Sequence, residues 1–170
     1  PAVSAETGSD EHGIIVLGLG LDGRGYVLED RSRRGTPREW ATSALAAYDE
    51  FDADAITIER NQGGDMCRHT LESVRPGIRV IDVTATRGKH VRAEPISSLY
   101  SQGRVSHVGT FPELEGQMVR MTSAGYEGDG SPDRVDALVW GFTELFPKMV
   151  RRPRPAIDHR NEESQGSWMG

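Results

Sequence analysis

The chain has 170 residues and a net charge of −6, with 36% hydrophobic and 27% charged residues. This length suits one domain with a core of its own, and the acidic total excludes a uniformly basic nucleic-acid-binding protein, although a local basic groove remains compatible with it. The single cysteine, Cys67, excludes an internal disulfide framework and a thiolate metal cluster, and no apolar run reaches the roughly 20 residues of a membrane span.

The first third of the chain predicts a β-hairpin followed by a helix. Apolar runs over residues 14–19 and 25–30 flank Asp22-Gly23, a strong turn signal, and so predict two antiparallel strands. A helix is predicted over residues 37–51, with Thr36 as its N-cap.

The rest of the chain alternates between strand and helix patterns. Strands are predicted over 55–59, 78–83 and 104–107, and helices over 65–74, 90–102, 112–121 and 132–146. Two antiparallel strands followed by βαβ units indicate an α/β fold, a mixed sheet flanked by helices. We expect this domain to span residues 1–146 and a basic, proline-containing flexible tail to span residues 147–170.

Two acidic elements lie far apart in the sequence. Glu59 closes the strand 55–59 before a glycine-rich turn, at the carboxyl end where open α/β sheets bind ligands. Ser131 is a candidate N-cap and Pro132 suits the first helical position, which places Asp133 and Asp136 near the start of the last helix. The apolar positions of that helix form one stripe: Val135, Leu138, Val139, Phe142 and Phe146. Carboxylates from a strand end and a helix start can converge on divalent metal ions, so the pattern predicts a metal-dependent phosphodiester nuclease.

Each carboxylate also has an ordinary explanation. A strand-end glutamate such as Glu59 often pairs with a nearby arginine. The helix dipole favours acids in the first turn whether or not they have a catalytic role, which covers Asp133 and Asp136.

Further motifs follow one another in a fixed order along the chain. They are residues 10–16 leading into 23–30, then 59–65, Arg87-Gly88-Lys89 with Arg92, Gly103-Arg104-Val105, and finally residues 131–138. In this order and spacing the sequence resembles the nuclease domain of the large terminase subunit of tailed phages and related gene-transfer particles, over about residues 1–146. The resemblance implies a ribonuclease H-like fold.

The resemblance also implies a site built from carboxylates. Glu59, Asp133 and Asp136 would be the catalytic metal ligands, with Asp10 as a further candidate. They would hold two Mg²⁺ or Mn²⁺ ions roughly 4 Å apart, one to activate water and one to stabilise the leaving 3′ oxygen. Domains of this family begin with a strand that ends in a ligand aspartate. We expect that aspartate to lie ahead of Pro1, and we therefore expect the first strand to be missing from this chain.

Basic residues gather near the strand 78–83 and the helix that follows it. We expect Arg87, Lys89, Arg92 and Arg104 to contact the DNA backbone, together with Asn61 from the turn after Glu59. Of the 20 basic residues in the chain, 18 are arginine, whose planar guanidinium suits phosphate. A solvated helix face explains the same cluster without DNA.

The resemblance implies partners and a setting. The domain would cut concatemeric double-stranded DNA during genome packaging, in the cytoplasm of the bacterial host and without a membrane. An ATPase domain of the same polypeptide, the small terminase subunit and the portal would be its partners, and this chain itself contains no Walker motif.

Two alternatives stay open. The same fold serves Holliday-junction resolvases and transposase-like nucleases. The chain would instead be a non-catalytic DNA-binding or motor-docking module if the first-strand aspartate were truly absent.

Overall fold

The computed structural model describes residues 11–60, 64–85 and 88–147. Its first strands, β1 (Ile15–Leu19) and β2 (Gly25–Asp30), form the predicted antiparallel hairpin, with Ile15 opposite Asp30. Gly23 adopts φ +74°, a conformation that a side chain disfavours, which explains the glycine in the turn. The short strand β5 (Val105–His107) extends this sheet by pairing in parallel with β2.

The other strands form two further sheets. Strands β3 (Ile56–Glu59) and β4 (Val80–Val83) pair in parallel, with Glu59 opposite Val83. Strands β6 (Met121–Thr122) and β7 (Gly125–Tyr126) form a small hairpin. The sequence pattern did not predict this hairpin, because two-residue strands are too short to show an alternation of apolar and polar side chains.

The predicted mixed sheet is therefore divided in the described part of the chain. Strand β1 pairs with β2 alone, and β3 pairs with β4 alone, so no backbone hydrogen bonds between these strands join the two sheets. Helix α5 (Asp133–Leu145) contacts both β1 and β3, so side-chain packing connects them instead.

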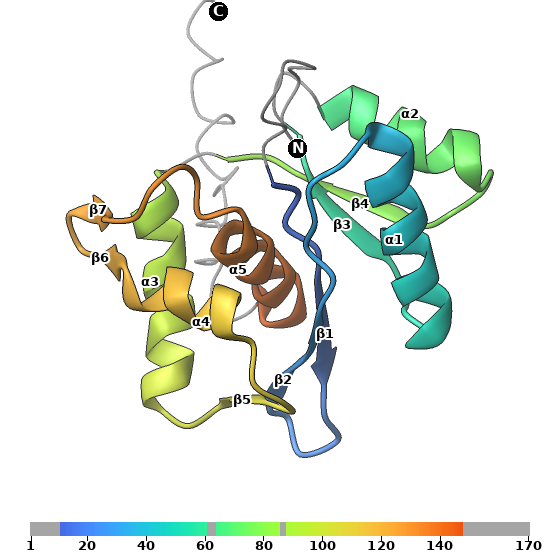
Figure 1. The fold of residues 1–170 in the computed structure, drawn as a ribbon. Coiled ribbons are helices and arrows are strands. Elements are labelled where there is room, and N and C mark those ends of the chain that lie inside the picture. The colour runs from blue at the N-terminus through green and yellow to red at the C-terminus, as the bar shows by residue number, and fades with distance from the viewer. Residues whose placement is uncertain (1–10, 61–63, 86–87, 148–170) are drawn as a thin grey trace, which may run out of the picture.

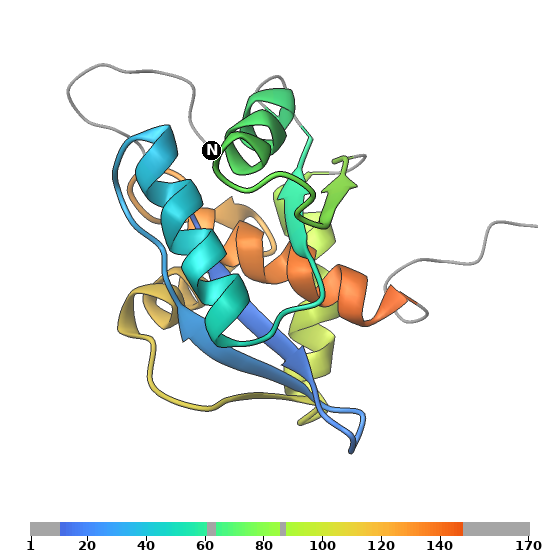
Figure 2. The same cartoon turned by 90° about the vertical axis from the view of Figure 1, so that its right-hand side faces the viewer.

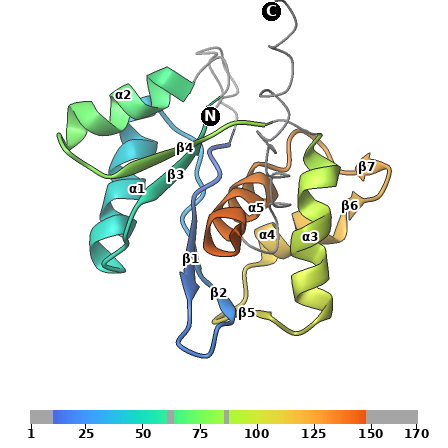
Figure 3. The same cartoon turned by 180° about the vertical axis from the view of Figure 1, so that it is seen from behind.

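Helices cover both sides of the strands. Figures 1 and 3 show α1 and α2 on one side and α3, α4 and α5 on the other. Their bounds are α1 Pro37–Glu50, α2 Gly64–Val74, α3 Lys89–Ser101 and α4 Pro112–Val119. Thr36 caps α1 as predicted, since its hydroxyl accepts from the backbone N–H of Glu39 while the Glu39 side chain accepts from the backbone N–H of Thr36. The last helix begins one residue later than predicted, at Asp133.

Two clusters of buried side chains form the core. The larger cluster surrounds α5, where the predicted apolar stripe is confirmed and Phe142 is fully buried. The second cluster lies between α1, α2 and β3, with Leu71 fully buried and Trp40 and Cys67 nearly so. Figure 2 shows α5 crossing behind the β1–β2 hairpin. The helix thus holds the larger core while it touches both β1 and β3.

None of the described helices combines the length and the apolar character that crossing a membrane requires.

Candidate active site

Two of the predicted carboxylates meet around one arginine. Glu59 ends β3, Asp136 lies on α5, and Arg92 comes from the first turn of α3. Arg92 Nη1 lies 3.3 Å from Glu59 Oε1, and Arg92 Nη2 lies 3.8 Å from Asp136 Oδ1. Glu59 and Asp136, called the acidic pair below, are thus brought together from positions 77 residues apart in the sequence.

Arg92 is held in place by packing as well as by charge. Its side chain is only 11% exposed, and its Cζ lies 4.4 Å from the centroid of the Trp140 ring. This cation–π contact and the two carboxylates leave Arg92 little freedom to move. Its Nε is buried without a hydrogen-bond partner among the described residues.

Lys89 is the second cation of the acidic pair. Its ammonium pairs with Asp136 Oδ2 and donates a hydrogen bond to Ser131 Oγ at 2.9 Å. Ser131 therefore binds Lys89, and the prediction that it caps α5 is wrong, because the N-cap residue is Pro132 and makes no side-chain cap bond. Lys89 is far more accessible than Arg92, with 46% of its side chain exposed.

Burial sets the electrostatics of Asp136. Removal from water raises the pKa of Asp136 above its ordinary value, against the opposing effect of Lys89 and Arg92, and the negative charge of Glu59 raises it further. A carboxylate in this environment favours a nearby cation.

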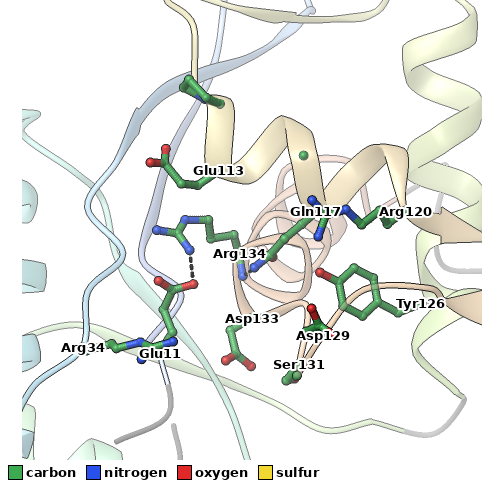
Figure 4. Close-up of a pocket in the computed structure, with 13 residues that line it drawn as sticks. Glu11, Arg34, Glu113, Gln117, Arg120, Tyr126, Asp129, Ser131, Asp133 and Arg134 are labelled. Carbon is green, nitrogen blue, oxygen red and sulfur yellow. Dashed lines mark hydrogen bonds and ion pairs between the residues drawn. The ribbon is translucent and has the colours of Figure 1, made fainter. Parts of the chain in front are cut away.

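Asp133 faces different surroundings from Asp136. It lines a cavity of about 530 Å³ together with Glu11, Ser131 and other polar residues (Figure 4). Asp133 and Asp136 lie about 4.5 Å apart along the helix axis. Asp136 is drawn to Lys89 and Arg92, whereas the ion pairs and hydrogen bonds of the acidic pair do not include Asp133.

Two contacts from distant segments position the start of α5. Gln117 of α4 accepts hydrogen bonds from the backbone N–H groups of Arg134 at 3.1 Å and Val135 at 3.3 Å. Gly13 lies so close to the helix that a Cβ built on it would meet Asp133 O at 2.0 Å. Sequence reasoning did not predict this role for either residue, since neither belongs to a local motif that indicates it.

Arg134 connects the helix to the rest of the domain. Its guanidinium pairs with Glu11, as Figure 4 shows, and its Nε donates to Asp30 Oδ2 at 2.8 Å. Burial lowers the pKa of Arg134 from its ordinary value. The pattern 131–138 contained this arginine, yet its sequence neighbours did not indicate which acids it would meet.

The structure separates one predicted DNA contact from the others. Arg104 follows the far end of α3 and stacks on Phe146, 5.3 Å from the ring centroid. A helix of 13 residues is about 20 Å long. The expected basic cluster of Lys89, Arg92 and Arg104 is therefore not formed, because the first two lie at the opposite end of α3. Arg87, Asn61 and Asp10 lie outside the described residues.

A three-carboxylate centre is likewise not assembled in the part of the chain that the structure describes. No three His, Cys, Asp or Glu side chains gather there closely enough to hold a metal ion. The acidic pair supplies hard oxygen ligands from two elements, β3 and α5. That donor set fits Mg²⁺, which binds one or two carboxylates and completes its shell with water and phosphate oxygens.

The residues described above lie within a region that matches a known protein family. A family model described as a terminase RNaseH-like domain matches residues 1–145. A search of curated proteins found no match. The matched residues include β3, α3 and α5, which carry the acidic pair and both of its cations. The chain thus belongs to the terminase RNase H-like domain family, the fold and family that its motif order had predicted.

Proposed function

We propose that this chain is the metal-dependent DNA endonuclease of a viral genome-packaging terminase, and that it cuts concatemeric double-stranded DNA. The observation that supports this most is the acidic pair: Glu59 from a strand end and Asp136 from α5 meet at a common cation within a terminase RNase H-like domain. Family membership by itself supports a nuclease-related role in terminase. The acidic pair adds the carboxylates that could bind the metal ions of such a nuclease.

We propose that two Mg²⁺ or Mn²⁺ ions bind at this centre. When bound, such ions activate water and stabilise the leaving oxygen of the phosphodiester. Glu59 and Asp136 offer carboxylate oxygens, which are hard ligands and suit these ions better than zinc. We propose that Asp133 and Asp10 complete the ligand set.

The residues around the acidic pair would orient its carboxylates and bind the DNA backbone. Arg92 holds one oxygen of each member of the acidic pair, so it fixes their separation and direction. Lys89, at the exposed start of α3, lies beside the acidic pair, where a DNA backbone phosphate would approach. Arg87 and Asn61 remain proposed contacts to the same backbone.

Membership of the family supports the proposed partners and setting. The ATPase domain of the same polypeptide, the small terminase subunit and the portal would bring DNA to the site, in the cytoplasm of the bacterial host. Such partners would select the position at which the DNA is cut, so the site itself would need to recognise little DNA sequence.

A plasmid-cleavage assay with the full-length protein tests the proposal. We expect Mn²⁺ or Mg²⁺ to support nicking and linearisation, and EDTA to stop both, because the hydrolytic water needs a metal. Glu59→Gln and Asp136→Asn should each lower the rate by about a hundredfold or more, since loss of even an outer-shell group costs about 10- to 100-fold. Asp133→Asn should have a similar effect, because Asp133 is also proposed as a ligand.

Glu72→Gln is the matched control, because Glu72 pairs with Arg68 on the exposed side of α2. It should cleave at the wild-type rate. Cleavage that persists in EDTA would exclude the metal mechanism. DNA binding without cleavage under any divalent ion would support the non-catalytic alternative.

A further inference from the structure

The two cations of the acidic pair differ in how tightly they are held. Arg92 is nearly buried and stacked on Trp140. Lys89 is about half exposed and reaches Asp136 with a flexible stem from the first residue of α3. Of the two, Lys89 is the one that can leave without disturbing the core.

Lys89 and Arg92 together occupy both oxygens of Asp136. Arg92 lies beside Oδ1, and the Lys89 ammonium contacts Oδ2. A divalent ion needs at least one of these oxygens at a contact distance of about 2.0–2.1 Å. A divalent ion and an ammonium on the same oxygen would lie within a few ångström of each other, and their repulsion opposes joint occupancy even though each carboxylate oxygen has two lone pairs. Metal binding at Asp136 therefore competes with the cations that already contact it.

We propose that Lys89 is a built-in competitor of the divalent ion: it occupies Asp136 in the metal-free protein, and metal binding releases it to contact a DNA backbone phosphate. This inference rests on the proposed function, since it takes Asp136 as a metal ligand. Ser131 supports the metal-free position, because its hydroxyl accepts from the same ammonium at 2.9 Å. A lysine suits the exchange because its compact charge binds phosphate without a fixed orientation.

The exchange of Lys89 couples the binding of the divalent ion to the binding of DNA. Metal frees Lys89 for DNA, and DNA draws Lys89 away from the metal position, so each ligand strengthens the binding of the other. In the metal-free protein Lys89 is held by Asp136 and Ser131, and it contributes little to DNA binding.

Calorimetric titration of the full-length protein with Mn²⁺, without nucleotide or DNA, tests the competition. Lys89→Met keeps the length of the stem and removes the charge, and we expect Mn²⁺ affinity to rise about tenfold, which corresponds to about 1.4 kcal/mol. Ser131→Ala keeps every charge and removes only the second anchor of Lys89, so we expect a rise of about threefold, in the range of one lost hydrogen bond. Asp136→Asn run in parallel identifies the heat that belongs to this site.

Arg75→Met is the charge-matched control. Arg75 has a similar exposure to Lys89 and pairs with Asp49 away from the acidic pair, so its loss changes the net charge equally. We expect wild-type Mn²⁺ affinity from it. Wild-type affinity in both Lys89→Met and Ser131→Ala would overturn the competition. A wild-type protein whose Mn²⁺ binding is absent, or is unaffected by Asp136→Asn, would overturn the proposed function itself.

DNA binding at several salt concentrations tests the release. In EDTA, wild type and Lys89→Met should show the same dependence of log affinity on log salt, because Lys89 is occupied. With Ca²⁺ in place of the catalytic ion, the wild-type slope should be steeper than that of the variant by about one unit, the signature of one more phosphate contact. Equal slopes in Ca²⁺, or a gap of one unit already present in EDTA, would overturn the release of Lys89 toward DNA.

Discussion

Arg92 is the residue that pairs with both carboxylates of the acidic pair. It contacts both carboxylates and the ring of Trp140 in a nearly buried position. Removal of one partner from a buried set of charges is costly, because the remaining charges lose their compensation while they stay out of water. At the surface the same loss costs little.

We therefore expect Arg92→Met to lower the free energy of unfolding by about 2–4 kcal/mol, slightly below the range for a fully buried pair because both carboxylates keep some exposure. Urea denaturation in EDTA measures this. Arg68→Met is the matched control, since Arg68 also bridges two acids, Glu72 and Asp82, but lies nearer the solvent. It should cost no more than about 1 kcal/mol. Equal losses in the two variants would show that burial does not distinguish Arg92.

The N-terminus of helix α5 is capped by a side chain of another helix, α4. The residue before the helix, Pro132, makes no side-chain cap bond, and the N–H groups of Arg134 and Val135 donate instead to Gln117 of α4. The same oxygen atom thus satisfies two backbone donors that would otherwise need water or a local cap. Because Asp133 and Asp136 follow at once, the position of Gln117 bears on the proposed site.

Gln117→Leu removes this acceptor at a similar side-chain size. We expect it to lower the free energy of unfolding by about 0.5–2 kcal/mol, the usual cost of a lost N-cap. Gln117→Glu keeps an oxygen acceptor and adds a negative charge that the helix dipole favours, so it should retain most of the stability. Urea denaturation of both variants checks this. The control Gln102→Leu removes an exposed amide that bonds Ser98 within α3, and it should change stability by less than about 0.5 kcal/mol. A loss in Gln117→Glu as large as in Gln117→Leu would argue against the cap.

At the scale of the whole molecule, α5 connects the two core clusters. It supplies much of the larger cluster and also contacts β3, which contributes Ile58 to the second cluster. Because one helix reaches both, we expect the clusters to unfold together as one cooperative unit.

Phe142→Ala tests whether the two core clusters unfold together. Phe142 is fully buried in the larger cluster, so its truncation should cost about 3–5 kcal/mol. Cys67 lies in the second cluster, and burial both shields its thiol and raises its pKa, so Cys67 reports global opening through labelling with a maleimide. Under native conditions we expect Phe142→Ala to speed labelling of Cys67 by about a hundredfold or more, as the free-energy loss implies. Mass spectrometry of the peptide that contains Cys67 follows the reaction.

Val119→Ala, at an exposed position of α4, is the control and should label at the wild-type rate. A destabilised Phe142→Ala protein with unchanged labelling of Cys67 would show that the two clusters open separately.

Local signals in the sequence determined the elements of this protein. The turn at Asp22-Gly23, the cap Thr36 and the apolar stripe of α5 are each confirmed, because a turn, a cap and a helical face depend on residues within a few positions of one another. The order of motifs also predicted the family, which the match over residues 1–145 confirms. The choice of Glu59, Asp133 and Asp136 as ligands stays a prediction.

Only the tertiary structure decided which of these groups meet. Asp136 meets Glu59 at Arg92, while Asp133 lines a cavity that neither of these two carboxylates lines. Lys89 and Arg92 pair with carboxylates, and Arg104 lies at the far end of α3. These outcomes depend on contacts between residues tens of positions apart, and no local pattern encodes which partner a charged side chain will find. The physical reason is that a buried charge takes the nearest opposite charge that folding brings to it, and packing of α5 against β1, β3 and α3 determines which charge that is.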